Sequence, residues 1–150
     1  MTEIFPAITN LDDERRQAII RENGGEIRCG WRGQQNDKGV FVDYDILPFR
    51  GLTAKGMATL ISEGFADSED AQNCAPTYKE IMDFIEVHPD FTAHGYIVTP
   101  ERDDYRVTVE GVAGYTDDCG EERAFAKMFR RADEYECNEH GDGYCRAWYD

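Results

Sequence analysis

Apolar residues along this chain recur at two different spacings, and the spacing changes from segment to segment. Helical spacing and helix-terminating residues mark four segments: 11–23, 53–65, the segment that begins at Thr77, and 120–131. Period-two alternation or β-prone composition marks four strands: 26–32, 40–47, 92–99 and 105–112. Pro48 is expected to end the second strand because proline has no backbone N–H. This order predicts an α+β fold in which about four helices pack on an antiparallel sheet of about four to five strands.

Three helix starts are marked by capping residues. Thr77 and Glu80 have the spacing of a capping box, in which each side chain accepts a hydrogen bond from the other residue's backbone N–H. Thr53 and Asp118 are expected to cap the second and fourth helices. An apolar stripe at helical spacing follows Thr77 and is expected to face the core: Tyr78, Ile81, Met82 and Ile85.

Two further segments are interpreted from alternation alone. The tail 134–149 alternates weakly and predicts one final strand. In the strand 92–99, His94 shares its phase with Tyr96 and Val98, so we expect His94 to face the core. A buried imidazole with satisfied hydrogen bonds is then a simpler interpretation than a metal ligand or a catalytic base.

The length of the chain is that of one domain, and we take 1–150 as a single domain. The order helix–strand–strand–helix occurs twice, over 11–66 and 77–133, and an acidic linker at 66–75 separates the two. This order fits a fold built from two αββα halves. The alternative is that αββα is a common arrangement and that the similar spacing is a coincidence.

Acidic residues dominate the composition. The chain has 31 acidic and 16 basic residues, a net charge of −15, and residues 76–150 contribute −10 of it with 18 acidic and 8 basic residues. Such a chain repels nucleic acids and anionic membranes and attracts basic surfaces. We therefore expect neither nucleic acid nor membrane as a direct partner. The alternative is that the acidity serves solubility or adaptation to salt.

The cysteines and the first residues bear on the compartment. An odd number of cysteines is unusual for a secreted disulfide framework, which mostly uses an even set. The first ten residues lack the basic and apolar regions of a signal peptide, and no stretch approaches the roughly 20 apolar residues of a membrane span. We expect a cytoplasmic protein. The five cysteines are Cys29, Cys74, Cys119, Cys137 and Cys145.

Motifs of the common enzyme classes are missing from the sequence. It contains no phosphate-binding loop of the Gly-x-x-x-x-Gly-Lys type, no Gly-x-Gly-x-x-Gly and no His-Glu-x-x-His. It contains no Gly-x-Ser-x-Gly either, and its only serines are Ser62 and Ser68. We predict that the protein is not an enzyme and assign no catalytic residue. An enzyme of unrecognised type is the third hypothesis.

One set of residues has ligand types and spacing that suit zinc. Cys137, His140 and Cys145 follow one another closely, and Cys119 supplies a fourth ligand for tetrahedral coordination. A small zinc-stabilised interaction domain is therefore the second hypothesis, and no other cofactor is expected. In the alternative, Cys145 packs as a small hydrophobic residue while Cys137 and His140 are exposed or half exposed.

The first hypothesis uses the spacing of the carboxylates. Asp43 and Asp45, two apart on a strand, lie about 6.6 Å apart, and acidic residues three apart on the third helix lie about 5–6 Å apart. These separations resemble those of phosphates along a nucleic-acid strand, so such a surface could fill a basic groove of a nucleic-acid-binding protein. The alternative for the helix is an ordinary solvated face. The expected binding residues are Asp43, Asp45, Glu80, Asp83, Glu86, Asp103, Asp104 and Glu110.

The C-terminal stretch 129–150 carries a resemblance to known sequences. It contains Phe129-Arg130-Arg131-Ala132-Asp133-Glu134-Tyr135 and ends in Arg146-Ala147-Trp148-Tyr149-Asp150. This stretch resembles the end of small acidic uncharacterised proteins encoded by phages, prophages and plasmids. The resemblance implies an accessory protein of a mobile genetic element, a group in which inhibitors of host defence are common. It implies no catalytic residue, and it favours the nucleic-acid mimic.

Overall fold

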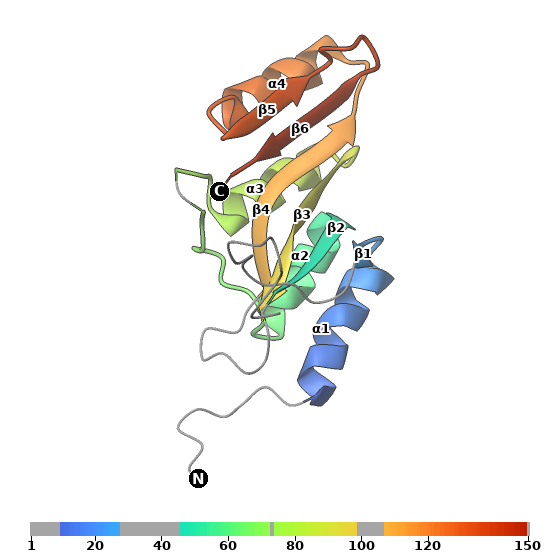
Figure 1. Cartoon of the computed structure of the whole chain (residues 1–150), viewed down its shortest axis with the longest axis vertical. Helices are drawn as coiled ribbons and strands as arrows, with labels where there is room; N and C mark the ends of the chain where they lie inside the picture. Colours follow the sequence, from blue (N-terminus) through green and yellow to red (C-terminus); the bar gives the residue numbers. More distant parts are fainter. Residues whose placement is uncertain (1–9, 28–45, 73, 99–106, 150) are drawn as a thin grey trace, which may run out of the picture.

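The computed structural model describes residues 10–27, 46–72, 74–98 and 107–149, and its strands form one antiparallel sheet (Figure 1). The strands lie in the order β1-β2-β3-β4-β6-β5. They are β1 (Glu26–Ile27), β2 (Ile46–Leu52), β3 (Phe91–Val98), β4 (Val107–Tyr115), β5 (Glu134–Cys137) and β6 (Tyr144–Trp148). The helices are α1 (Asn10–Glu22), α2 (Ala54–Ser62), α3 (Tyr78–Val87) and α4 (Cys119–Phe129). The predicted α+β fold is confirmed, with slightly more strands than expected.

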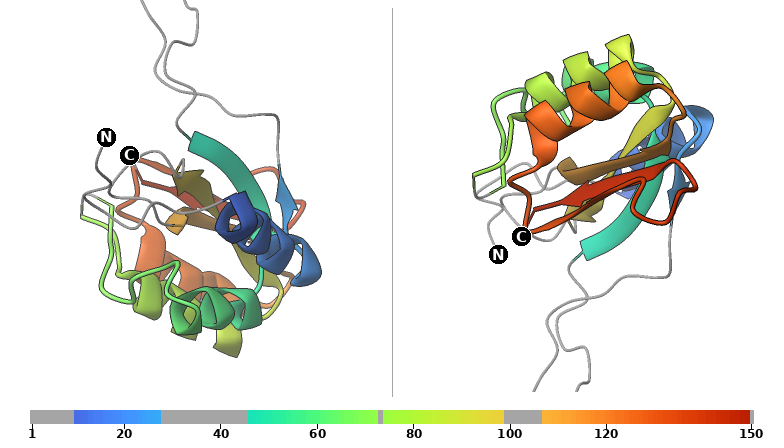
Figure 2. Two further views of the ribbon diagram at one scale, coloured as in Figure 1. Left: turned by 90° about the horizontal axis from the view of Figure 1, so that it is seen from below. Right: turned by 90° about the horizontal axis from the view of Figure 1, so that it is seen from above.

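The helices α2, α3 and α4 lie together on one face of the sheet (Figure 2). Between this layer and the sheet, Phe91 of β3 contacts Phe84 of α3 and Phe125 of α4, with ring centroids 5.7 and 5.0 Å apart. Phe129 of α4 also packs against Phe84, at 5.0 Å. Such aromatic pairs add about 0.5–1.5 kcal/mol each to the burial of their area. They fix α3 and α4 against each other and against the sheet.

The predicted helix caps are confirmed. The Thr53 hydroxyl accepts a hydrogen bond from the backbone N–H of Gly56, and Thr77 and Glu80 form the capping box. A carboxylate oxygen of Asp118 accepts from the N–H groups of Gly120 and Glu121, at 2.7 and 3.1 Å. These bonds satisfy backbone donors that a helix start leaves unpaired.

Two strand predictions were wrong. Pro48 does not end a strand but lies inside β2, opposite Tyr96 of β3. A proline ring is compatible with extended backbone, and the cost is confined to one missing donor. The tail forms two strands, β5 and β6, which pair with each other, and β6 also pairs with β4. The weak alternation of the tail did not indicate the turn at 138–143, where Asn138, Gly141 and Gly143 have positive φ.

The prediction for His94 was also wrong. In β3 the core residues are Phe91, Ala93 and Ile97, which places His94 on the opposite face of the sheet, where it is partly exposed. His94 is directly opposite Gly111 of β4, and a side chain at residue 111 would collide with the imidazole. Alternation gave the phase of the strand correctly, but not which of its faces meets the helices.

A buried arginine fastens α1 to the sheet. Arg16 is fully buried, with 0% of its surface exposed. Its Nη2 lies 2.9 Å from a carboxylate oxygen of Asp13, and its Nη1 donates to the carbonyl oxygen of Val98 at 2.8 Å. A buried cation is tolerated because it is paired and hydrogen-bonded.

Candidate binding surface

Four of the eight predicted binding residues lie among the described residues, and they are on two elements, α3 and β4. Glu80, Asp83 and Glu86 are exposed on α3, in the helical layer. Glu110 of β4 is partly buried and lies at the irregularity in the β3–β4 pairing, between Val109 and Gly111, which pair with Gly95 and His94. The remaining four lie outside the described residues: Asp43, Asp45, Asp103 and Asp104.

The acidic row of α3 is also partly neutralised. A carboxylate oxygen of Glu80 accepts from the Thr77 N–H within the capping box, at 2.9 Å. Asp83 forms an ion pair with Lys79 one turn earlier, at 3.0 Å. These contacts agree with the alternative of an ordinary solvated helix face. Of the three residues, Glu86 forms no hydrogen bond or ion pair with the described residues.

Another set of carboxylates does converge, at the start of α4. A cavity of about 530 Å³, which we call the acidic cavity, is lined by Asp90, Asp117, Glu122 and Asp142. Among the described residues that line it there is no lysine or arginine. Its other lining residues are Tyr115, Thr116, Cys119, Asn138, Gly141 and Gly143. The four carboxylates come from the α3–β3 turn, the β4–α4 connection, the first turns of α4 and the β5–β6 turn.

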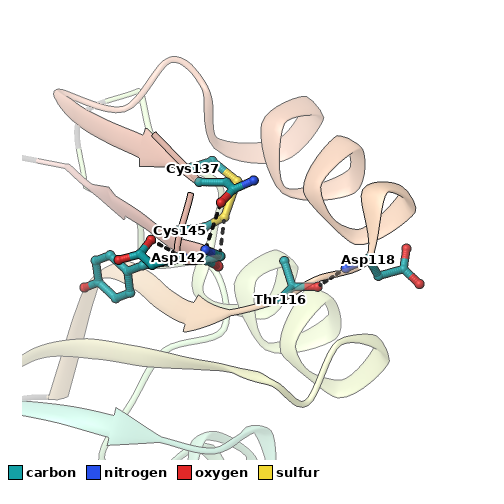
Figure 3. Close-up of a disulfide and its surroundings, with 8 residues drawn as sticks. Thr116, Asp118, Cys137, Asp142 and Cys145 are labelled. Atoms are coloured by element: carbon teal, nitrogen blue, oxygen red, sulfur yellow. Dashed lines mark hydrogen bonds between the residues drawn. A yellow bond between two sulfur atoms is a disulfide. The ribbon is translucent and has the colours of Figure 1, made fainter. Parts of the chain in front are cut away.

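Local hydrogen bonds hold these connections together (Figure 3). The Thr116 N–H donates to the carbonyl oxygen of Gly143 at 2.9 Å, which joins the β4–α4 connection to the β5–β6 turn. The Thr116 hydroxyl accepts from the N–H of Asp118, the residue that caps α4. Gly143 has φ +80°, and a Cβ there would lie 2.5 Å from the Thr116 carbonyl oxygen. A glycine is therefore required at this contact.

The expected zinc ligands are arranged differently from a metal site. Cys137 of β5 and Cys145 of β6 form a disulfide across the hairpin (Figure 3). Disulfide sulfurs are not the thiolates that bind zinc. The side chain of His140 is 78% exposed, and Cys119 is an exposed free thiol. Within the described ranges, no group of three or more histidine, cysteine, aspartate or glutamate residues could hold a metal ion. These four residues therefore do not form the expected zinc site.

The disulfide also bears on the compartment. Stable disulfides are typical of oxidising environments and rare in the cytosol. The cytoplasmic location inferred from the sequence stays a prediction, and the disulfide counts against it.

A second cavity, on the sheet face away from α2, α3 and α4, adjoins the first. It has a volume of about 480 Å³ and shares Asp90 and Tyr115 with the acidic cavity. Tyr115 is 63% exposed, and its ring lies 5.0 Å from that of Tyr144. Burial raises the pKa of Tyr144, and Glu136 and Tyr115 raise it further, against the lowering effect of Arg146 and Arg50. Exposed Tyr115 and half-buried Tyr144 therefore form an aromatic pair beside the carboxylates.

Sequence reasoning missed this assembly. The sequence places Asp117 and Glu122 at a helix start, and nothing in it links them to Asp90 or Asp142. The residues lie in turns, where neither helical nor strand periodicity applies. The pairing of β4 with β6 and the packing of α3 beside α4 bring them together.

Comparison of the chain with protein-family models, curated proteins and solved structures gives no match. Among the described residues, no helix is both long enough and apolar enough to cross a membrane.

Proposed function

We propose that this protein is a non-catalytic binding protein that docks, through the acidic cavity and the surface around it, on the basic nucleic-acid-binding surface of another protein. The observation that carries this proposal is the convergence of Asp90, Asp117, Glu122 and Asp142 on one cavity, with no cation among the described residues that line it. Carboxylates held close together without a counterion repel one another, and a basic partner relieves that repulsion.

The proposed partner is attracted both at long range and at contact. The net charge of −15 steers a basic protein towards this one at low ionic strength. At contact, lysine and arginine side chains of the partner act as counterions to these carboxylates, as they do when they bind phosphates. The exposed ring of Tyr115 offers a face for a guanidinium group beside the carboxylates. This combination supports mimicry of a nucleic acid, and with the C-terminal resemblance it supports a host defence protein as the partner.

The experiment is capture of the tagged protein's partner from host lysate, followed by competition and by charge reversal. The test variant carries Asp90→Lys, Asp117→Lys and Glu122→Lys, because Asp142 also accepts a hydrogen bond from the Tyr144 N–H. The matched control carries Glu14→Lys, Glu22→Lys and Glu69→Lys, which change the net charge equally at exposed positions outside the cavity. Both variants are first checked for folding by circular dichroism.

Support requires three results together. The captured protein binds nucleic acid, duplex DNA or rising salt displaces it, and the test variant loses it while the control retains it. Capture alone does not count. Equal retention by both variants sinks the proposed site, and equal loss shows that net charge, rather than this cavity, drives the association.

A further inference from the structure

The cations that the structure describes fall into two groups. Five lie in ion pairs with carboxylates: Arg15, Arg16, Arg50, Lys79 and Arg146. Six form no ion pair among the described residues: Arg21, Lys55, Arg123, Lys127, Arg130 and Arg131. Four of these six fall between residues 123 and 131, on α4 and just after it. Arg123 and Lys127, four residues apart, lie on the same side of α4, and Arg130 and Arg131 follow the helix directly.

Three of these cations share one cavity. Lys127, Arg130 and Arg131 line a hollow of about 290 Å³, which we call the basic cavity. Among the described residues that line it there is no carboxylate. The other lining residues are Cys74, Ala75, Pro76, Met128 and Tyr149. In a chain with almost twice as many acidic as basic residues, three unpaired cations facing one hollow is the opposite of what the composition favours.

The helix dipole accounts for part of this arrangement. A cation in the last turn of a helix is stabilised by about 0.3–1 kcal/mol, and Lys127 lies there. The helix dipole does not explain why the side chains of Lys127, Arg130 and Arg131 all line the basic cavity. Two like charges about 8 Å apart repel each other by about 0.5 kcal/mol even in water. The convergence therefore costs free energy in the unliganded protein, and an anion in the cavity would recover it.

We propose that the basic cavity binds a phosphate group carried by a small organic molecule. Two guanidinium groups can each donate a pair of hydrogen bonds to phosphate oxygens, while the Lys127 ammonium acts as a point charge. Pro76 and Met128 give the cavity an apolar wall, which suits the organic part of the ligand. This site lies at the end of α4 opposite the acidic cavity and does not depend on the function proposed for that cavity.

The first test is isothermal titration calorimetry at low ionic strength with phenyl phosphate and with inorganic phosphate. The test variant carries Lys127→Gln, Arg130→Gln and Arg131→Gln. The control carries Arg21→Gln, Lys55→Gln and Arg123→Gln, three unpaired exposed cations that do not line the cavity. Both variants change the net charge equally. We expect saturable 1:1 binding of phenyl phosphate by the parent protein and the control, and binding at least about tenfold weaker in the test variant.

Cys74 supplies a second test at the cavity itself. It is an exposed free thiol and lines the basic cavity, whereas Cys119, also exposed and free, lines the acidic cavity. Bound phenyl phosphate should slow alkylation of Cys74 by iodoacetamide and leave the rate at Cys119 unchanged. Peptide mass spectrometry resolves the two sites.

The outcomes separate the possible ligands. Tighter binding of phenyl phosphate than of inorganic phosphate, with protection of Cys74, supports an organic phosphate. Equal affinity for phenyl phosphate and inorganic phosphate overturns the proposal of an organic phosphate and indicates free phosphate as the ligand. Absence of saturable binding, or equal weakening in the test and control variants, overturns the site.

Discussion

The two ends of α4 present opposite chemistry. Four carboxylates and no described cation line the cavity at its start, and three cations and no described carboxylate line the cavity at its end. A helix of 11 residues is about 16 Å long, which exceeds the Debye length of about 8 Å at physiological ionic strength. Charges at the two ends of the helix are therefore largely screened from each other, whereas Glu122 and Lys127, five residues apart, are not. A net charge of −15 describes the approach of a distant partner, but not what either site binds.

The two regions also differ in how they are held. Connections between elements form the acidic cavity, and a disulfide and the Thr116 contacts fix them. The basic cavity is formed by the end of a helix, by the segment 74–76 before α3, and by Tyr149, whose ring is buried. We expect perturbations of the β5–β6 hairpin to affect the first cavity and to spare the second.

The largest expected difference between the two ends follows from breaking the disulfide. It closes a loop with a sequence separation of 8 residues, for which chain entropy predicts a loss of about 2–3 kcal/mol of stability. Reducing the parent protein, or making Cys137→Ala with Cys145→Ala, should lower the urea midpoint accordingly. Partner binding at the acidic cavity should weaken, while phosphate binding at the basic cavity should persist.

The control for this prediction is the variant Cys74→Ala with Cys119→Ala. Both thiols are free and exposed, so its urea midpoint should match that of the parent protein. A parent protein whose stability is unchanged by reductant would contradict the structural role of the disulfide.

The two free thiols should also differ in the charge of the reagent they accept. At low salt the basic cavity should favour anionic iodoacetate over neutral iodoacetamide at Cys74, and the acidic cavity should disfavour it at Cys119. The compared quantity is the rate of alkylation by iodoacetate divided by the rate with iodoacetamide. From the summed Coulomb energies we expect this ratio to be on the order of tenfold higher at Cys74 than at Cys119. The difference should shrink at about 1 M salt, where the Debye length is about 3 Å. Equal ratios at Cys74 and Cys119 would show that the two cavities do not differ in electrostatic potential.

Capping should make the start of α4 more sensitive to substitution than its end. Asp118→Ala removes two hydrogen bonds to the first turn and should cost about 1 kcal/mol. Lys127→Gln at the other end removes only a favourable charge, at about 0.3–1 kcal/mol. Urea denaturation measures both, and Asp118→Asn separates the hydrogen bonds from the charge. A larger loss for Lys127→Gln would show that its side chain stabilises the fold by another contact.

The smallest expected difference between the two ends of α4 is in their response to high pH, because a tyrosine near each end should lose stability in the same way. Burial raises the pKa of Tyr144 near the acidic cavity and of Tyr149 at the basic one, and Asp133 raises the latter further. Because the folded-state pKa of each lies above the unfolded value of about 10, the stability it confers is complete below pH about 10 and declines as the pH rises through the folded pKa.

Tyr144→Phe and Tyr149→Phe should each flatten this alkaline decline, measured as urea midpoints over the same pH range. Tyr78, which lines neither cavity, offers a reference, since burial raises its pKa as well and its hydroxyl donates to the Met57 carbonyl oxygen. A decline that persists unchanged in both phenylalanine variants would assign it to other groups.

Much of the local structure could be predicted from the sequence. The caps at Thr53, Thr77 and Asp118 were correct because a cap depends on residues within about four positions along the chain. The apolar stripe of α3 was correct for the same reason, since helical spacing alone places its residues on one face. The alternation of β3 was correct in its period, yet the core face was assigned to the wrong set of residues.

Sequence by itself determined the α+β class, the helix starts and the excess of acidic charge, because each depends on composition or on neighbours along the chain. Tertiary structure decided that His94 lies away from the helices, that Cys137 bonds to Cys145, and which charges meet in the two cavities. Asp90 and Asp142 are 52 positions apart in the sequence and line one hollow because strand pairing and helix packing join their turns. Charged residues in turns follow no helical or strand spacing, so the sequence does not indicate which of them lie together. Only the folded chain brings them into one cavity.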